Sequence, residues 1–320
     1  MDQRVRQHGD VTPLAPGKFS DPDVTAKGER RASVALKRLD TLWVNTGTLC
    51  NLTCGNCYIE SSPTNDRLAY ISAAEVAAYL DEIAALGLGT REIAFTGGEP
   101  FMNPEFTAML EDALARGFEA LVLTNAMRPM MKCAGPLLDL KRHFGEKLTL
   151  RVSIDHFSRK GHEAERGHHS WAPMIKGLRW LSDNGFKIAV AGRSGFGEPG
   201  EDLRAGFANL FLREGLTIDA NDPSQLVLFP EMDAAKDVAE ITTACWDILH
   251  KNPDDIMCAT SRMVVKRKGA ERPAVLSCTL LAYDPQFELG PRLADALGPI
   301  KLNHPHCATF CVLGGASCSA

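Results

Sequence analysis

The chain has 320 residues, of which 45% are hydrophobic and 23% charged, and its net charge is −5. This composition suits a globular protein with a sizeable core and excludes a globally disordered chain. The acidic balance disfavours nucleic acid as a partner, and the sequence has no run of about 18 apolar residues that would cross a membrane. Residues 1–23 lack the apolar core of a secretory signal, so we expect a cytoplasmic protein.

The first 40 residues are polar and contain three prolines and a basic run at 27–31. They predict a polar N-terminal arm with little regular structure of its own. From residue 41 to about 232, short β-type runs alternate with helical patterns. The strands are expected at residues 42–46, 92–96, 120–124, 148–154, 187–192 and 225–229.

Amphipathic segments between these strands predict helices over residues 72–86, 104–117 and 172–184. The first helix opens with Ser72 as N-cap and Glu75 three residues later, which is a capping box, and it ends at Gly87. The strands are mostly apolar rather than alternating, as expected for a parallel sheet covered on both faces. We therefore predict an α/β fold, with a partial (β/α)6 TIM-like barrel as its core over residues 41–232.

The character of the sequence changes near residue 232, where we place a domain boundary. A helix is expected over residues 233–251, followed by a tail rich in cysteine, proline and glycine. Residues 263–278 predict a hairpin within this tail. We expect residues 233–320 to form a small C-terminal cysteine-rich subdomain.

The ten cysteines favour metal or cluster ligation, because disulfides are rare in the cytoplasm. Cys50, Cys54 and Cys57 form a C-x3-C-x2-C pattern directly after the first predicted strand. Three thiolates can bind three irons of a four-iron cluster and leave the fourth iron open. A structural zinc ion normally needs four protein ligands, so zinc here would require a remote partner. Cys133 and Cys245 stand alone and are expected to be buried structural thiols.

The segment CNLTCGNCY (50–58) resembles the cluster loop of radical S-adenosylmethionine (SAM) enzymes, especially the SPASM and twitch subfamilies. Further segments resemble that family in the same order: FTGGEP (95–100), LTN (123–125), VSID (152–155) and GHEAERG (161–167). Asn56 departs from the pattern, since an aromatic residue or histidine is usual before the third cysteine.

The resemblance implies that Cys50, Cys54 and Cys57 ligate a [4Fe-4S] cluster whose open iron binds SAM. It also implies SAM contacts, in which Gly97, Gly98 and Glu99 receive the ammonium group, Ser153 and Arg166 the carboxylate, and Asn125 the adenosine. The implied reaction is reductive cleavage of SAM to a 5′-deoxyadenosyl radical that abstracts hydrogen from a substrate. An external one-electron reductant of the flavodoxin or ferredoxin type would supply the electron. No residue is assigned a catalytic acid or base role.

The tail holds five further cysteines, Cys258, Cys278, Cys307, Cys311 and Cys318. This region loosely resembles the twitch and SPASM extensions, which implies an auxiliary iron–sulfur cluster, although the spacings differ from the family pattern. The alternatives are a zinc site that uses His304 or His306, or a redox-active pair of thiols.

The substrate is the least determined feature. The subfamily resemblance implies a peptide or protein substrate by analogy. The same chemistry on a small metabolite or biosynthetic intermediate is a second hypothesis. A third is a non-catalytic iron–sulfur or zinc protein that binds a partner.

Overall fold

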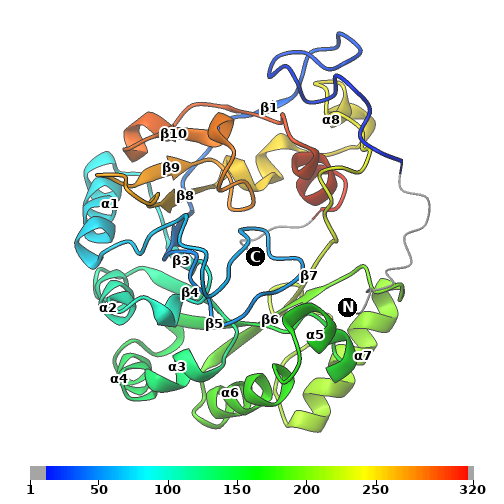
Figure 1. Ribbon diagram of the computed structural model, residues 1–320. Coiled ribbons are helices and arrows are strands. Elements are labelled where there is room, and N and C mark those ends of the chain that lie inside the picture. Colours follow the sequence, from blue (N-terminus) through cyan, green and yellow to red (C-terminus); the bar gives the residue numbers. More distant parts are fainter. Residues whose placement is uncertain (1–11, 316–320) are drawn as a thin grey trace.

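The computed structural model describes residues 12–315, and within them a curved sheet of nine strands forms the centre of the molecule (Figure 1). Its barrel strands are β2 (Thr41–Asn45), β3 (Glu92–Thr96), β4 (Glu119–Thr124), β5 (Leu148–Ser153), β6 (Lys187–Arg193) and β7 (Leu226–Phe229), each parallel to its neighbours. Three later strands, β8 (Ser261–Val265), β9 (Ala274–Leu276) and β10 (Glu288–Gly290), extend it in the order β10-β9-β8-β2-β3-β4-β5-β6-β7. A separate pair joins β1 (Ser33–Val34) to β11 (Ile300–Lys301).

Helices connect the barrel strands and lie outside the crescent that the strands form (Figure 1). They are α1 (Ala73–Leu86), α2 (Phe106–Ala115), α3 (Arg128–Lys132), α4 (Ala134–Phe144), α5 (Arg159–Arg166), α6 (Trp171–Asp183) and α7 (Gly200–Glu214). The short α8 (Cys245–Ile248) and a π-helical turn (Cys307–Val312) belong to the C-terminal region. The arrangement confirms the predicted α/β fold with a partial (β/α)6 barrel.

The central barrel strands are buried on both faces, as their apolar sequences predicted, while the edge strand β7 is half-buried. Leu42 and Ile93 pack outward, in the core that the strands share with the surrounding helices. Their neighbours Trp43 and Ala94 point the other way and belong to a second core inside the barrel. This alternation follows from the two-residue period of a strand, and burial of both faces needs the covering helices.

The predicted strands and helices of the barrel are confirmed to within about two residues, and the first helix shows why. The Ser72 hydroxyl accepts the Glu75 N–H, and the Glu75 carboxylate accepts the Ser72 N–H at 2.9 Å, which completes the capping box. Gly87 ends the helix with a φ of 59°, a left-handed conformation that glycine adopts without strain.

The C-terminal region continues the barrel sheet across residue 232. Strand β8 lies parallel to β2, and β8 and β9 form the predicted hairpin. The helix predicted over residues 233–251 is wrong, because only Cys245–Ile248 is helical. Residues 233–244 instead form an extended strap that pairs with the N-terminal region at Pro13–Lys236 and Arg31–Thr242.

Residues 12–40 contain little regular structure, yet they pack against the C-terminal region, while residues 1–11 lie outside the described part. Arg31 is 1% exposed, and its guanidinium forms a 2.6 Å ion pair with Glu240 of the strap. The Glu240 carboxylate also accepts the backbone N–H groups of Phe19 and Ala26. The arm and the strap therefore order each other through a buried charge pair. Among residues 12–315, no helix has the length and apolar character needed to span a membrane.

Candidate active site

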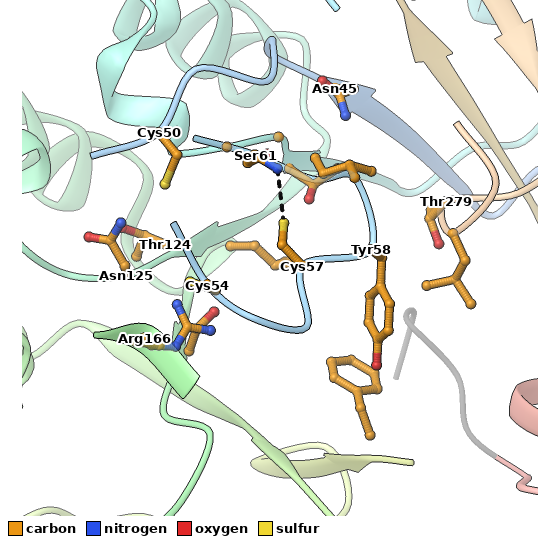
Figure 2. A pocket seen from close by; sticks show the side chains of 18 of the residues that line it. Asn45, Cys50, Cys54, Cys57, Tyr58, Ser61, Thr124, Asn125, Arg166 and Thr279 are labelled. Atoms are coloured by element: carbon orange, nitrogen blue, oxygen red, sulfur yellow. Dashed lines mark hydrogen bonds between the residues drawn. The ribbon is translucent and has the colours of Figure 1, made fainter. Parts of the chain in front are cut away.

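The loop after β2 brings Cys50, Cys54 and Cys57 to one cavity at the carboxyl ends of the barrel strands (Figure 2). The cavity has a volume of about 160 Å³ and is partly open to solvent. Five of the six residues expected to contact SAM line the same cavity, namely Gly97, Gly98, Asn125, Ser153 and Arg166. Carboxyl ends of parallel strands meet at one edge of the sheet, which brings these distant segments together.

The three sulfur atoms lie in surroundings that suit iron-bound thiolates. The Leu52 N–H donates to the Cys50 sulfur at 3.4 Å. The Ser61 N–H donates to the Cys57 sulfur at 3.3 Å (Figure 2). Burial raises the pKa of Cys50 to about 12 and also raises the pKa of Cys54. These thiols therefore keep their protons unless a metal replaces them.

In the described range 12–315, no three His, Cys, Asp or Glu side chains converge as they would around a single metal ion. Thiolates of a four-iron cluster stand further apart, because each binds a different iron. Three inward-facing cysteines with two N–H donors aimed at sulfur thus fit a cluster of that size.

The turn at Gly97 and Gly98 lies directly against the cysteine loop. The Gly98 N–H donates to the Gly47 carbonyl at 2.8 Å. A Cβ atom on Gly98 would lie 2.2 Å from the Leu49 carbonyl oxygen, and one on Gly97 would lie 2.6 Å from that of Gly47. Both positions require glycine for this close approach of two backbones.

Glu99 is 1% exposed, and it is absent from the described residues that line the cavity. Its carboxylate accepts the Thr124 hydroxyl and the Asn125 N–H, both at 2.8 Å. Burial raises the pKa of Glu99 to about 7 in spite of these donors. The contacts tie the end of β4, which carries Asn125, to the glycine turn.

An arginine pair surrounds the buried Asp155 at the end of β5. Arg166 lies 2.8 Å and Arg193 3.4 Å from its carboxylate oxygens. Burial works to raise the pKa of Asp155, but the two guanidinium groups together hold it below its usual value. The cation that would meet the SAM carboxylate is therefore held in place by a carboxylate of the protein.

Arg193 was not predicted as a site residue, although a cation at the end of a barrel strand is a signal for one. It donates to the Asn56 carbonyl at 2.6 Å and to the Tyr58 hydroxyl at 3.3 Å. Its guanidinium also lies over the Tyr58 ring, 4.7 Å from the centroid. Arg193 thus holds the backbone of Asn56, the loop residue that departs from the family pattern.

Four of the five tail cysteines line a second, smaller cavity, together with His306 and several apolar side chains. The four are Cys258, Cys278, Cys307 and Cys311, and Cys318 lies outside the described residues. Burial raises the pKa of Cys258 to about 11 and holds the pKa of Cys307 well above its usual value. Cys133 and Cys245 lie elsewhere and are half-buried against the apolar cores.

The buried Arg262 lies beside this second cavity. It is 1% exposed, and its guanidinium donates to the carbonyls of Cys258 at 2.6 Å and Ala296 at 2.8 Å. None of the ion pairs found among the described residues involves it. Burial lowers its pKa to about 10, against the opposing effect of Cys258. A buried cation without a carboxylate favours a negatively charged group nearby.

The sequence matches the family model of the radical SAM superfamily over residues 44–205. The chain belongs to the radical SAM superfamily. It is therefore a radical SAM enzyme, which works with a [4Fe-4S] cluster and SAM, and the hypothesis of a non-catalytic metal-binding protein is wrong. The matched range contains the three cysteines of the loop and all the predicted SAM contacts.

Among curated proteins, the chain is 32% identical over 143 residues to the antilisterial bacteriocin subtilosin biosynthesis protein AlbA of Bacillus subtilis. It is 29% identical over 159 residues to GTP 3′,8-cyclase of Synechocystis. These matches cover 44% and 48% of this chain, but only 30% and 45% of the two relatives. The chain thus spans less than half the length of either one.

Solved structures confirm the fold at low sequence identity. Streptococcus suis SuiB bound to SAM matches with a TM-score of 0.57 and 12% identity, over 78% of this chain and 63% of SuiB. The protein anSMEcpe with bound SAM matches with a TM-score of 0.56 and 12% identity, over 80% of this chain and 79% of that one.

Proposed function

We propose that this enzyme abstracts hydrogen from a peptide or protein substrate, with Cys50, Cys54 and Cys57 as the ligands of its SAM-cleaving cluster. The observation that carries the proposal is that the three cysteines share one cavity with the glycine turn, Ser153 and Arg166. We propose that residues 41–232 bind and cleave SAM and that residues 233–320 form an auxiliary site.

When bound, the cluster supplies an electron that breaks a carbon–sulfur bond of SAM. The chain's own residues position SAM. Arg166, held by Asp155, receives the carboxylate of SAM together with Ser153. The carbonyls of the turn at Gly97 and Gly98 accept from its ammonium group, and Asn125 contacts the adenosine. Glu99 holds Asn125 against this turn.

We further propose that Cys258, Cys278, Cys307 and Cys311 hold an auxiliary iron–sulfur cluster. Four thiols in one apolar cavity can ligate a cluster without help from Cys318. The charge of Arg262 supports this assignment, because thiolate-ligated clusters are anionic and would compensate the buried guanidinium. A zinc ion on the same thiols is the alternative outcome of metal analysis.

A peptide substrate is supported by relatives and by the charges of the cavity. AlbA is named for bacteriocin biosynthesis, and SuiB has been crystallised with its precursor peptide SuiA. GTP 3′,8-cyclase, by contrast, is named for GTP, a nucleoside triphosphate. Binding sites for phosphate groups usually contain cationic side chains. The two arginines that line the cavity here, within the described residues, are both paired with Asp155. This pairing favours a substrate of low charge.

The test is deuterium transfer into 5′-deoxyadenosine. Anaerobically reconstituted enzyme is incubated with SAM, a reductant and a tryptic digest of protein from bacterial cells that were grown in deuterated water. A parallel reaction receives the deuterated small-molecule extract of the same cells. We expect mass spectrometry to find deuterated 5′-deoxyadenosine with the digest. Label that enters from the small-molecule extract alone would contradict the peptide proposal and favour a metabolite.

A further inference from the structure

Asn45, the last residue of β2, has a buried donor for which the described residues provide no acceptor. The residue is 1% exposed and lines the same cavity as the three cysteines. Its Oδ1 accepts the Gly47 N–H at 3.0 Å, which fixes the orientation of the carboxamide. Its Nδ2 is buried, and no atom of the described chain accepts a hydrogen bond from it. A buried donor without an acceptor costs free energy, so a ligand that supplies an acceptor is favoured.

The position of Asn45 separates this donor from the proposed SAM contacts. Figure 2 shows Asn125 and Arg166 on one side of the cysteine loop, and Asn45 and Thr279 on the other. SAM held by the first pair therefore leaves the Asn45 side for the second reactant.

The walls on the Asn45 side are apolar. Trp43 lies two residues earlier on β2 and so faces the same way, and Leu280 follows Thr279 in the cavity wall. A second polar side chain of the cavity, Ser61, lies at the cysteine loop, where its N–H donates to the Cys57 sulfur; it is 5% exposed and also has an unpartnered oxygen among the described atoms. Neither Asn45 nor Ser61 carries a charge. This end of the cavity thus offers neutral hydrogen bonds beside apolar surface.

We propose that the Asn45 carboxamide donates from Nδ2 to a backbone carbonyl oxygen of the peptide substrate. The apolar walls at Trp43 and Leu280 then receive an apolar side chain next to that carbonyl. This inference rests on the proposed function and makes Asn45 a determinant of substrate binding. A peptide carbonyl matches a neutral donor in an apolar site, whereas a phosphate or carboxylate would favour a cation there.

The experiment measures binding of N-acetyl-leucine N-methylamide to enzyme loaded with cluster and SAM, by ligand-observed NMR at about pH 8. Asn45→Asp keeps the oxygen that accepts the Gly47 N–H and replaces the donor, while Asn45→Ala removes both groups. Asn221→Asp, the same change at an exposed position, is the matched control. We expect about tenfold weaker binding in both Asn45 variants and unchanged binding in the control.

Iron content and SAM affinity, measured on the same samples, show that the variants retain the loaded site. Binding in the Asn45 variants within twofold of the wild type, or no binding to the wild type, overturns the inference. The deuterium experiment separates the two proposals. If deuterium is transferred from peptides but peptide binding is unchanged in the Asn45 variants, only this inference is refuted. If no deuterium is transferred from peptides, the proposed function itself is refuted.

Discussion

The two cysteine sites of this enzyme differ in thiol number, polarity and charge. The loop after β2 places three sulfurs in a cavity that also holds the paired charges of Arg166 and Asp155. The tail places four sulfurs in an apolar cavity, and beside it lies the buried Arg262, which forms no ion pair with the described residues. Leu280 lines both cavities, so a single side chain separates them at that point.

The difference indicates different tasks for similar ligands. Three thiolates leave one iron open, and a zwitterion such as SAM needs both a cation and acceptors around it. Four thiolates complete the coordination of a cluster, and apolar walls then isolate it from water. In our proposal, the number of thiols and the surrounding charge, more than cysteine itself, distinguish the SAM-cleaving site from the closed auxiliary site.

The largest expected effect separates the two sites by iron content and activity. Cys54→Ala should lose about four irons per chain and abolish 5′-deoxyadenosine formation, because its cluster can no longer be held. Cys278→Ala should also lose about four irons but keep substrate-free SAM cleavage. Iron analysis and chromatography of the products check both. Equal loss of SAM cleavage in the two variants would show that the loop and tail cysteines do not have separate roles.

Substitution of Arg166 tests whether its charge contributes to SAM binding at the three-cysteine site. Arg166→Met should weaken SAM binding by roughly 30- to 100-fold, since it removes a buried cation that faces the carboxylate. Arg159→Met, on the exposed face of the same helix, is the control. Isothermal titration of SAM into loaded enzyme measures both. An affinity within threefold of the wild type would show that Arg166 does not bind SAM.

Glu99 gives a pH dependence with a defined sign. Because burial raises its pKa to about 7 from 4.5, the folded state favours the protonated carboxyl. Its contribution to the free energy of unfolding is therefore fully present below about pH 4.5 and is lost as pH rises to about 7. The loss is at most about 3 kcal/mol. Urea unfolding of the metal-free chain measures this. The free energy of unfolding should depend less on pH in Glu99→Gln than in the wild type or in the exposed control Glu111→Gln.

Arg262 should produce the smallest effect, confined to the closed site. Arg262→Met removes a cation near an anionic cluster and should lower its reduction potential by on the order of 50 mV. A redox titration followed by electron paramagnetic resonance measures this, with Arg267→Met on the hairpin as control. An unchanged potential would argue that the guanidinium serves packing alone.

The barrel was predictable because its signals are local. Apolar runs of strand length, the Ser72 capping box and Gly87 each act within a few residues, and the structure repeats them. The order of the cysteine, GGEP and arginine segments likewise predicted which residues would meet at the strand ends. Residues 233–244 have a helical pattern, yet Glu240 is drawn into contacts with Arg31 and two N–H groups far away in sequence.

The sequence by itself determined the barrel, the three-cysteine loop and the family, because periodicity and motif order survive without tertiary information. Tertiary structure alone decided the ordering of the N-terminal arm, the clamp of Arg193 on the loop and the buried donor of Asn45. It also decided which tail cysteines share a cavity. Each depends on contacts between distant segments and on burial, and neither quantity is present in a linear pattern.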